Sequence, residues 1–212
     1  WNGWKAQLLR TLYDSAEEVV RMGHKQTGRQ ERIAQRQQAL QQASGLDPRS
    51  FAAYAKRLPD SYWVSETPDV LAANMALVRA ADAGHEQFVI RSRPEPGRGT
   101  TLVTVYAADH PGLFYRIAGG ISLGGANIVG ARIYTTRDGM ALDNLVVQDP
   151  LGGPFDDPDR LARMEQAIGD ALAGRVRLAD RLGARPLPRW RQDAFHLVPQ
   201  VFLDNRASNR FT

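Results

Sequence analysis

The sequence predicts an α+β protein in which a helical region precedes a β-α-β-β-α unit. Apolar and β-branched side chains fill residues 102–106, a composition that is typical of a strand. Further along, Asp138-Gly139 separates two apolar runs, which is a strong signal for a β-hairpin. In the N-terminal part, apolar side chains recur at helical spacing. Together these observations place helices first and a sheet after them.

The central unit begins with the strand at 102–106 and continues into a helix. Asp109 can cap a helix N-terminus, and Pro111 suits a first turn because its missing N–H is no loss there. Apolar side chains spaced for one buried face then predict a helix over residues 113–123. The pair Gly124-Gly125 ends it.

The unit continues with two strands, at 127–134 and 140–147, and a second helix at 157–173. This order is one strand short of the split-βαβ, ferredoxin-like βαββαβ motif. Residues 196–204 have the composition of a strand and would supply the missing element. The predicted domain is therefore an antiparallel sheet with two helices on one face.

Two segments connect this unit to the rest of the chain. Before it, residues 87–93 are predicted to form an edge strand, and residues 93–97 a turn-forming linker. After it comes an Arg- and Pro-rich insertion near 174–195, which is either a solvated loop or a docking surface for an acidic partner. Its basic side chains are Arg175, Arg177, Arg181, Arg185, Arg189 and Arg191.

Residues 1–84 are predicted to be helical. The segment at 29–44 is polar almost all round, with Ile33 and Leu40 as its large apolar anchors, so it depends on packing against another element. The aromatic-rich helices at 46–83 could form a DNA-binding helix-turn-helix or a connector that packs its aromatic side chains against a neighbour. The connector is favoured, because no helix here carries a basic face for a DNA groove.

The composition excludes several classes of site. The chain has no cysteine, which excludes disulfides, thiolate catalysis and cysteine-ligated metals. No apolar run approaches the ~20 residues of a membrane span, and no signal peptide is present, so we expect a cytoplasmic protein without a membrane partner. The formal net charge of +4 is modest, so no nucleic acid partner is expected.

Two motifs, DHPGLF after the first strand and ANI at the start of the second, resemble the signature of the ACT domain, a small-molecule sensor. Longer phrases are similar to the C-terminal half of the bifunctional uridylyltransferase/uridylyl-removing enzyme family, which modifies the PII nitrogen-signalling protein. These phrases are WNGWKAQLLRTLY, RLPDSYW, YAADHPGLFYRIAG, ARIYTTRDGMALDNLVVQD and VFLDNRASNRFT.

This resemblance implies a domain organisation. In the family, two ACT domains follow a nucleotidyltransferase domain and an HD-type phosphohydrolase domain. Residues 1–84 would then be the end of the hydrolase domain plus a helical connector. Residues 85–205 would be the first ACT domain, including the insertion near 174–195, and residues 206–212 would begin a truncated second ACT domain.

The chain departs from the family where catalysis is concerned. It has no adjacent His-Asp dyad, because residues 109–110 read Asp-His, and no Gly-Ser followed by Asp-x-Asp. We therefore expect no catalytic residue and no metal site or cofactor here, and Mg only in the parent enzyme. Gly119-Gly120 is also unexpected inside a helix, since each glycine costs roughly 1 kcal/mol relative to alanine. Either a close helix–sheet contact requires this pair or the helix is soft.

The resemblance implies a glutamine site at the start of the 113–123 helix. Free N–H groups from about Gly112 to Phe114 would receive the α-carboxylate, at a position where Gly112 lets a ligand approach closely. The predicted ligand-binding residues are Asp109, Pro111, Gly112, Leu113, Asn127 and Ile128.

Each of these side chains has a role in the predicted site and a structural alternative. Asp109 would meet the α-ammonium group, or only cap the helix. Asn127 would serve polar groups of the ligand, or only bond its own backbone. Leu113 and Ile128 would wall the pocket, or lie in the core.

The expected function is regulatory. By resemblance, the chain is a glutamine-sensing fragment of the PII uridylyltransferase/uridylyl-removing enzyme. The alternative is an ACT-type interaction module that docks on the hydrolase domain or on PII without binding a metabolite. The expected partners are glutamine, PII, and a second ACT domain or another copy that associates through the ACT sheet.

Overall fold

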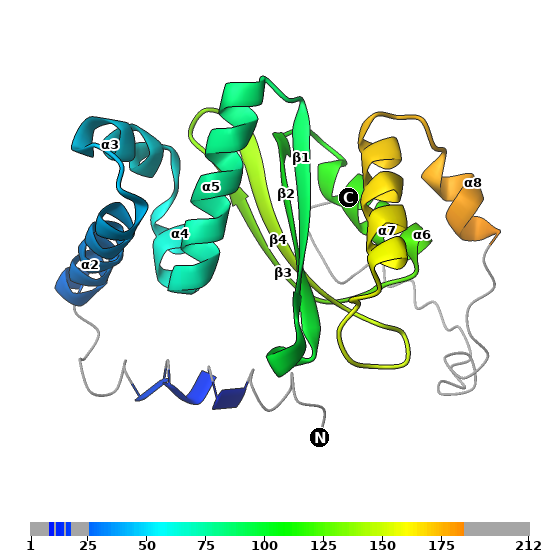
Figure 1. The fold of residues 1–212 in the computed structure, drawn as a ribbon, viewed down its shortest axis with the longest axis horizontal. Helices are drawn as coiled ribbons and strands as arrows, with labels where there is room; N and C mark the ends of the chain where they lie inside the picture. The colour runs from blue at the N-terminus through cyan, green and yellow to red at the C-terminus, as the bar shows by residue number, and fades with distance from the viewer. Residues whose placement is uncertain (1–8, 11, 15, 18–25, 185–212) are drawn as a thin grey trace, which may run out of the picture. The chain divides into compact units, whose positions relative to one another are not determined.

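The computed structural model describes residues 9–10, 12–14, 16–17 and 26–184, and Figure 1 shows their fold. The contacts divide the chain into one unit, Trp1–Leu182, and a second unit, Gly183–Thr212. The predicted strand at 196–204 and the predicted start of a second ACT domain at 206–212 lie outside the described residues. So does the second half of the Arg- and Pro-rich insertion.

Four described helices precede the sheet: α2 (Gln26–Ser44), α3 (Pro48–Arg57), α4 (Asp60–Ser65) and α5 (Pro68–Gly84). Local capping explains where α3 begins, because the Asp47 carboxylate accepts hydrogen bonds from the backbone N–H groups of Arg49 and Ser50 at 3.1 and 3.0 Å. The two apolar anchors predicted for α2, Ile33 and Leu40, are both buried.

The described sheet has four strands in the order β1-β2-β4-β3, and each neighbouring pair is antiparallel. They are β1 (Phe88–Glu95), β2 (Thr100–Ala108), β3 (Asn127–Thr135) and β4 (Met140–Gln148). Helix α6 (Leu113–Gly124) connects β2 to β3, and α7 (Pro158–Leu172) and the short α8 (Leu178–Gly183) follow β4. The predicted α+β class, hairpin and edge strand are confirmed.

One detail of the edge strand differs from the prediction. Strand β1 continues to Glu95, so the turn into β2 is the 3-10 helix Pro96–Arg98 and not residues 93–97. Pro94 is tolerated inside β1 because the strand lies at the edge of the sheet. In a βαββαβ fold, the last strand of the unit lies beside its first strand. In this chain the first strand of the unit is β2, and the strand beside it is β1, which precedes the unit.

Helices cover both faces of the sheet (Figure 1). Side chains alternate between the two faces of a strand, so Val103 and Val105 of β2 pack toward α6 and α7, while Tyr106 joins the core formed with α3, α4 and α5. This two-sided burial explains the unbroken apolar run of β2.

The aromatic side chains of α4 pack against the sheet, whereas the prediction named only packing against a neighbour. Tyr62 of α4 is fully buried and meets Tyr134 of β3 edge-on, with ring centroids 5.1 Å apart. Trp63 is buried beside them, and its ring lies 5.3 Å from that of Tyr62. The helical region and the sheet therefore share one hydrophobic core.

The glycines of α6 are explained by a close contact between helices, not by the predicted contact with the sheet. A Cβ atom added to Gly120 would lie 2.5 Å from the Cα atom of Ile168 on α7, and one added to Gly124 would lie 2.7 Å from Cα of Met164. Glycine at these positions lets the two backbones touch. A soft helix is not needed to explain Gly120, whereas this backbone contact does not account for Gly119.

Substituting two neighbouring glycines tests this contact. We expect Gly120→Ala to lower the free energy of unfolding by about 2 kcal/mol, because overpacking against a backbone atom outweighs the ~1 kcal/mol gain in helix propensity. Gly119→Ala is the matched control: its Cβ would meet only the end of the Leu178 side chain, which can move. Urea denaturation of both variants measures the difference, and equal losses would contradict the role of the contact.

Candidate functional site

The predicted ligand site begins in the loop between β2 and α6. Gly112 is the N-cap residue of α6 and has a left-handed conformation with φ of 85°, which explains why glycine stands there. The N–H group of Leu113 donates to the carbonyl oxygen of His110 at 3.1 Å. The N–H groups of Gly112, Phe114 and Tyr115 have no acceptor among the described residues, so of the three predicted donors only that of Leu113 is already engaged.

Asp109 does not cap α6, so the capping alternative is wrong. Its carboxylate accepts a hydrogen bond from the Thr135 hydroxyl at 2.9 Å, and its N–H group donates to the Gly139 carbonyl at 2.9 Å. These bonds fix an exposed carboxylate between the end of β2 and the β3–β4 hairpin.

The space in front of the helix start is open. A Cβ atom added to Gly112 would meet no atom within 4 Å, and Pro111 is exposed. Leu113, however, is 3% exposed and belongs to the core between the sheet and α6. Leu113 therefore lies in the core, as its structural alternative has it.

The structure places the other two predicted residues at the opposite end of the sheet. Strands β2 and β3 are parallel to each other because both are antiparallel to β4. Asn127 and Ile128 begin β3, whereas Asp109 lies beside its last residue, Thr135. The nine residues of β3 span about 26 Å. One copy of the domain therefore does not bring all six predicted residues together.

Strand β3 is an edge of the described sheet, and apolar side chains are exposed along it. Ile128 and Ile133 are 36% and 48% exposed. Phe114 and Tyr115, in the first turn of α6, are also about half exposed. An edge strand with free backbone groups and apolar side chains is suited to pairing with another strand.

A buried carboxylate close to Asp109 was not predicted. Asp143 of β4 is 1% exposed, and its Oδ1 atom has no hydrogen-bond partner among the described residues. Burial raises the pKa of Asp143 to about 7, a backbone hydrogen bond with Tyr134 opposes this rise, and the Asp109 carboxylate adds to it. The sequence signal was a single acidic residue inside a strand whose other side chains are uncharged.

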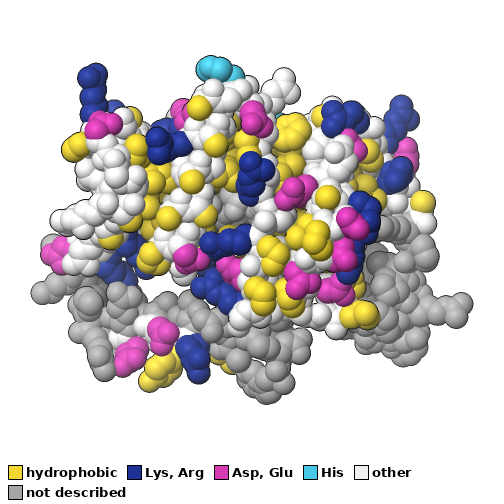
Figure 2. Space-filling view, in the orientation of Figure 1, with side chains coloured by type: hydrophobic (Ala, Val, Ile, Leu, Met, Phe, Trp, Pro, Cys, Tyr) yellow, Lys and Arg dark blue, Asp and Glu magenta, His cyan; other side chains and the backbone are white. Residues whose placement is uncertain are grey.

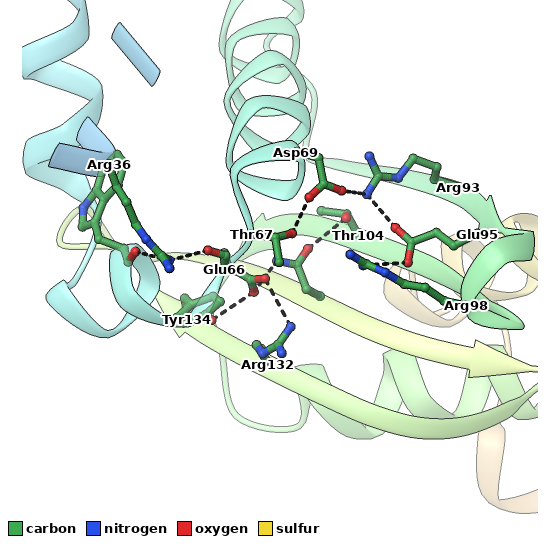
Figure 3. Close-up of polar contacts among 12 residues, drawn as sticks. Arg36, Glu66, Thr67, Asp69, Arg93, Glu95, Arg98, Thr104, Arg132 and Tyr134 are labelled. Carbon is green, nitrogen blue, oxygen red and sulfur yellow. Dashed lines mark hydrogen bonds and ion pairs between the residues drawn. The ribbon is translucent and has the colours of Figure 1, made fainter. Parts of the chain in front are cut away.

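A second buried carboxylate, Glu66, lies on the other face of the sheet (Figure 3). Glu66 follows α4, and its side chain is 1% exposed. It accepts hydrogen bonds from the Tyr134 hydroxyl at 3.0 Å and from the Asn144 amide at 2.9 Å, and it pairs with Arg132 at 3.3 Å. Burial and the neighbouring Glu66 carboxylate raise the pKa of Tyr134.

The backbone of the same segment is also held. One guanidinium nitrogen of Arg36, from α2, donates to the carbonyl oxygens of Trp63 and Glu66 at 2.8 and 2.6 Å. Helices α2 and α4 and strands β3 and β4 therefore meet at Glu66. Sequence reasoning missed this junction, because nothing local distinguishes Glu66 from an exposed glutamate.

Within residues 9–10, 12–14, 16–17 and 26–184, no three His, Asp or Glu side chains come together as a metal site would require. None of the helices in the same ranges is both long and apolar enough to cross a membrane.

No protein-family model matches the chain. Along its whole length, the chain is similar to proteins called bifunctional uridylyltransferase/uridylyl-removing enzyme. Identity is 51% with the protein from Novosphingobium aromaticivorans, 50% with that from Erythrobacter litoralis and 46% with that from Zymomonas mobilis. The chain spans 23% of the length of each of these relatives.

Proposed function

Because the chain matches a segment of the bifunctional uridylyltransferase/uridylyl-removing enzymes along its whole length, we propose that it is the glutamine-sensing, regulatory part of such an enzyme. The parent enzyme would act in the cytoplasm on PII, attaching and removing uridylyl groups. Its catalytic residues and Mg would belong to the remainder of the parent protein. The role of this segment is then to report glutamine to those catalytic domains.

The start of α6 is the observation that carries this proposal. The free N–H groups of Phe114 and Tyr115 stand at the positive end of a helix dipole and suit an α-carboxylate. The Asp109 carboxylate, fixed by Thr135, would meet the α-ammonium group. The open space at Gly112 leaves room for the ligand between them.

A second ACT-like sheet would complete this site. If β3 paired antiparallel with the equivalent edge strand of another domain, the first residues of one strand would face the last residues of the other. The partner's counterparts of Asn127 and Ile128 would then approach Asp109 and the start of α6. This pairing accounts for the separation of the two halves of the site within one domain.

A melting experiment on the 212-residue chain tests the proposal. At 100 times its dissociation constant, glutamine should stabilise the fold by about 2.7 kcal/mol, which raises the melting temperature by about 5–10 °C. Glutamate and alanine should have no comparable effect.

Two aspartate variants make this test specific. Asp109→Asn should abolish the shift by glutamine while keeping an acceptor for Thr135, whereas Asp156→Asn, at an exposed position, should retain it. Sedimentation velocity should show that glutamine favours self-association. The proposal would be refuted if glutamine produced no specific shift in this chain and none in a protein that contains both ACT domains.

The exposed apolar side chains favour a second candidate function, an interaction module that binds no metabolite. Phe114, Tyr115, Ile128 and Ile133 would then contact the hydrolase domain or PII directly. A pull-down of PII that is unaffected by Asp109→Asn, together with no calorimetric signal for glutamine, would support this alternative.

A further inference from the structure

The turn of the β3–β4 hairpin, residues 136–139, lies between the proposed glutamine site and the helical region. It is closed by its own backbone. The Thr136 N–H group donates to the Met140 carbonyl oxygen at 2.7 Å, and the Gly139 N–H group donates to the Thr136 carbonyl oxygen at 3.0 Å. Gly139 has a φ of 80°, a conformation that favours glycine. A turn closed in this way is expected to move as a unit, so a contact that holds one side of it also positions the other.

One side of the turn holds Asp109. The Gly139 carbonyl oxygen accepts a hydrogen bond from the Asp109 N–H group at 2.9 Å, and the Thr135 hydroxyl, next to the turn, donates to the Asp109 carboxylate at 2.9 Å. In the proposed site this carboxylate meets the α-ammonium group of the ligand. Its position therefore depends on where the turn lies.

The other side of the turn contacts Arg57, the last residue of α3. The Arg57 Nε atom lies 2.8 Å from a carboxylate oxygen of Asp138, which belongs to the turn. The Arg57 carbonyl oxygen accepts a hydrogen bond from the Arg137 N–H group at 2.8 Å. Carbonyl groups in the last turn of a helix have no partner within the helix, so this bond satisfies one of them. Arg57 thus holds the turn by both its side chain and its backbone.

The Arg57 side chain is itself held by two other elements. Acidic and basic side chains lie next to one another over the visible face in Figure 2, and most exposed pairs of this kind contribute little to stability. Arg57 differs because its side chain is only 21% exposed, pairs with Asp82 of α5 at 2.7 Å and donates a hydrogen bond to the Tyr106 hydroxyl of β2. A guanidinium has five N–H donors in a rigid plane, so it can bind several acceptors at once. Arg57 is therefore a fixed point against which the turn is positioned.

We propose that Arg57 is a positioning residue of the glutamine site, acting through other residues and not on the ligand itself. It holds the hairpin turn through Asp138, and the turn holds Asp109. This inference rests on the proposed function and assigns to it a route by which the site and α3 affect each other. Because coupling between two sites is reciprocal, glutamine at Asp109 should in turn stabilise the contact between the turn and Arg57.

Two aspartates form a matched pair for the test. Each pairs with Arg57, and their side chains are similarly exposed, 47% for Asp138 and 50% for Asp82, but only Asp138 belongs to the turn. Asp138→Asn removes the charge and keeps a dipeptide, Asn-Gly, that favours the same turn, so it should weaken glutamine binding about threefold. Asp82→Asn should leave the affinity unchanged. Calorimetry on the 212-residue chain measures both, and equal effects of the two substitutions would overturn the proposal.

Substitution of the arginine itself should have a larger effect. We expect Arg57→Gln to weaken glutamine binding about tenfold, and Lys56→Gln, an exposed change beside it on α3, to leave it unchanged. A purely structural role of Arg57 would lower the melting temperature without changing a dissociation constant measured well below that temperature. An unchanged dissociation constant in Arg57→Gln would therefore overturn the proposal.

Hydrogen exchange without ligand tests the same contact independently of glutamine. The Asp109 N–H group should exchange at least about threefold faster in Asp138→Asn than in the parent chain, because the turn that accepts its hydrogen bond opens more often. Exchange in Asp82→Asn should match the parent. Equal exchange in all three proteins would show that the turn is held without Arg57, and would overturn the proposal.

The proposed function and this inference fail in different ways. A parent chain that does not bind glutamine would refute the proposed function, and exchange at Asp109 would still decide whether Arg57 positions this residue. Glutamine should also slow exchange of the Arg137 N–H group, which donates to Arg57. A parent chain that binds glutamine without slowing this exchange would retain the proposed function and overturn the inference.

Discussion

The Glu66→Ala variant is expected to lose about 3–5 kcal/mol of unfolding free energy, a fall of roughly 10 °C in melting temperature. The Glu66 carboxylate accepts hydrogen bonds from Tyr134 and Asn144 and pairs with Arg132. Its removal leaves a buried hydroxyl and a buried amide without an acceptor, in a place that water does not reach. The loss therefore exceeds that of an ordinary surface ion pair.

Urea and thermal denaturation measure this loss, with Glu86→Ala as the matched control. Glu86 is exposed beyond the end of α5, so its truncation should change stability by less than about 0.5 kcal/mol. Arg132→Ala should have a small effect, because the Arg132 side chain is 44% exposed. If Glu66→Ala and Glu86→Ala behaved alike, the buried carboxylate would not be what joins the connector to the sheet.

Stability is expected to fall as the pH rises from about 4 to about 7, because of Asp143. The pKa of this carboxyl is raised from 3.8 to about 7 in the folded protein. Between these two values the folded state holds a proton that the unfolded state has released, so raising the pH favours unfolding. A pKa shift of this size lowers the free energy of unfolding by at most about 4 kcal/mol. The full decrease is reached once the pH has passed the pKa of the folded state.

Denaturation at several pH values checks this prediction. Asp143→Asn should be more stable than the parent at pH 8 and should show a flatter profile between pH 4 and 7. Hydrogen bonds and ion pairs lower the pKa values of Asp47, Asp69 and Asp149. These three carboxylates therefore affect stability below about pH 4, where stability falls as the pH falls, which is the opposite of the effect of Asp143. An unchanged slope in Asp143→Asn would assign the pH dependence to other groups.

Local signals in the sequence were enough for most of the elements. Asp138-Gly139 predicted the hairpin, and Pro111 with Gly124-Gly125 predicted the limits of α6 to within two residues. Contacts between distant residues could not be predicted in this way. Gly120 is explained only by the backbone of α7, and the burial of Asp143 depends on how the helices cover the sheet.

The candidate site was partly predictable. Asp109 and Gly112 were placed correctly at the start of α6, because a Pro-Gly turn after a strand has few alternatives. The separation of Asn127 from them follows from topology. A strand-helix-strand crossover makes β2 and β3 parallel, so β3 begins at the end of the sheet opposite to the one where β2 ends. Motif spacing alone does not contain that information.

The shared core of helices and sheet has a consequence for any attempt to cut the protein into parts. Tyr62 and Trp63 of α4 are buried against Tyr134 and Leu142 of the sheet, so a break between α5 and β1 would expose a large aromatic surface on each side. A protease that cleaved at His85 would then release neither half as a stable piece. The helical region and the sheet are therefore expected to fold and unfold together.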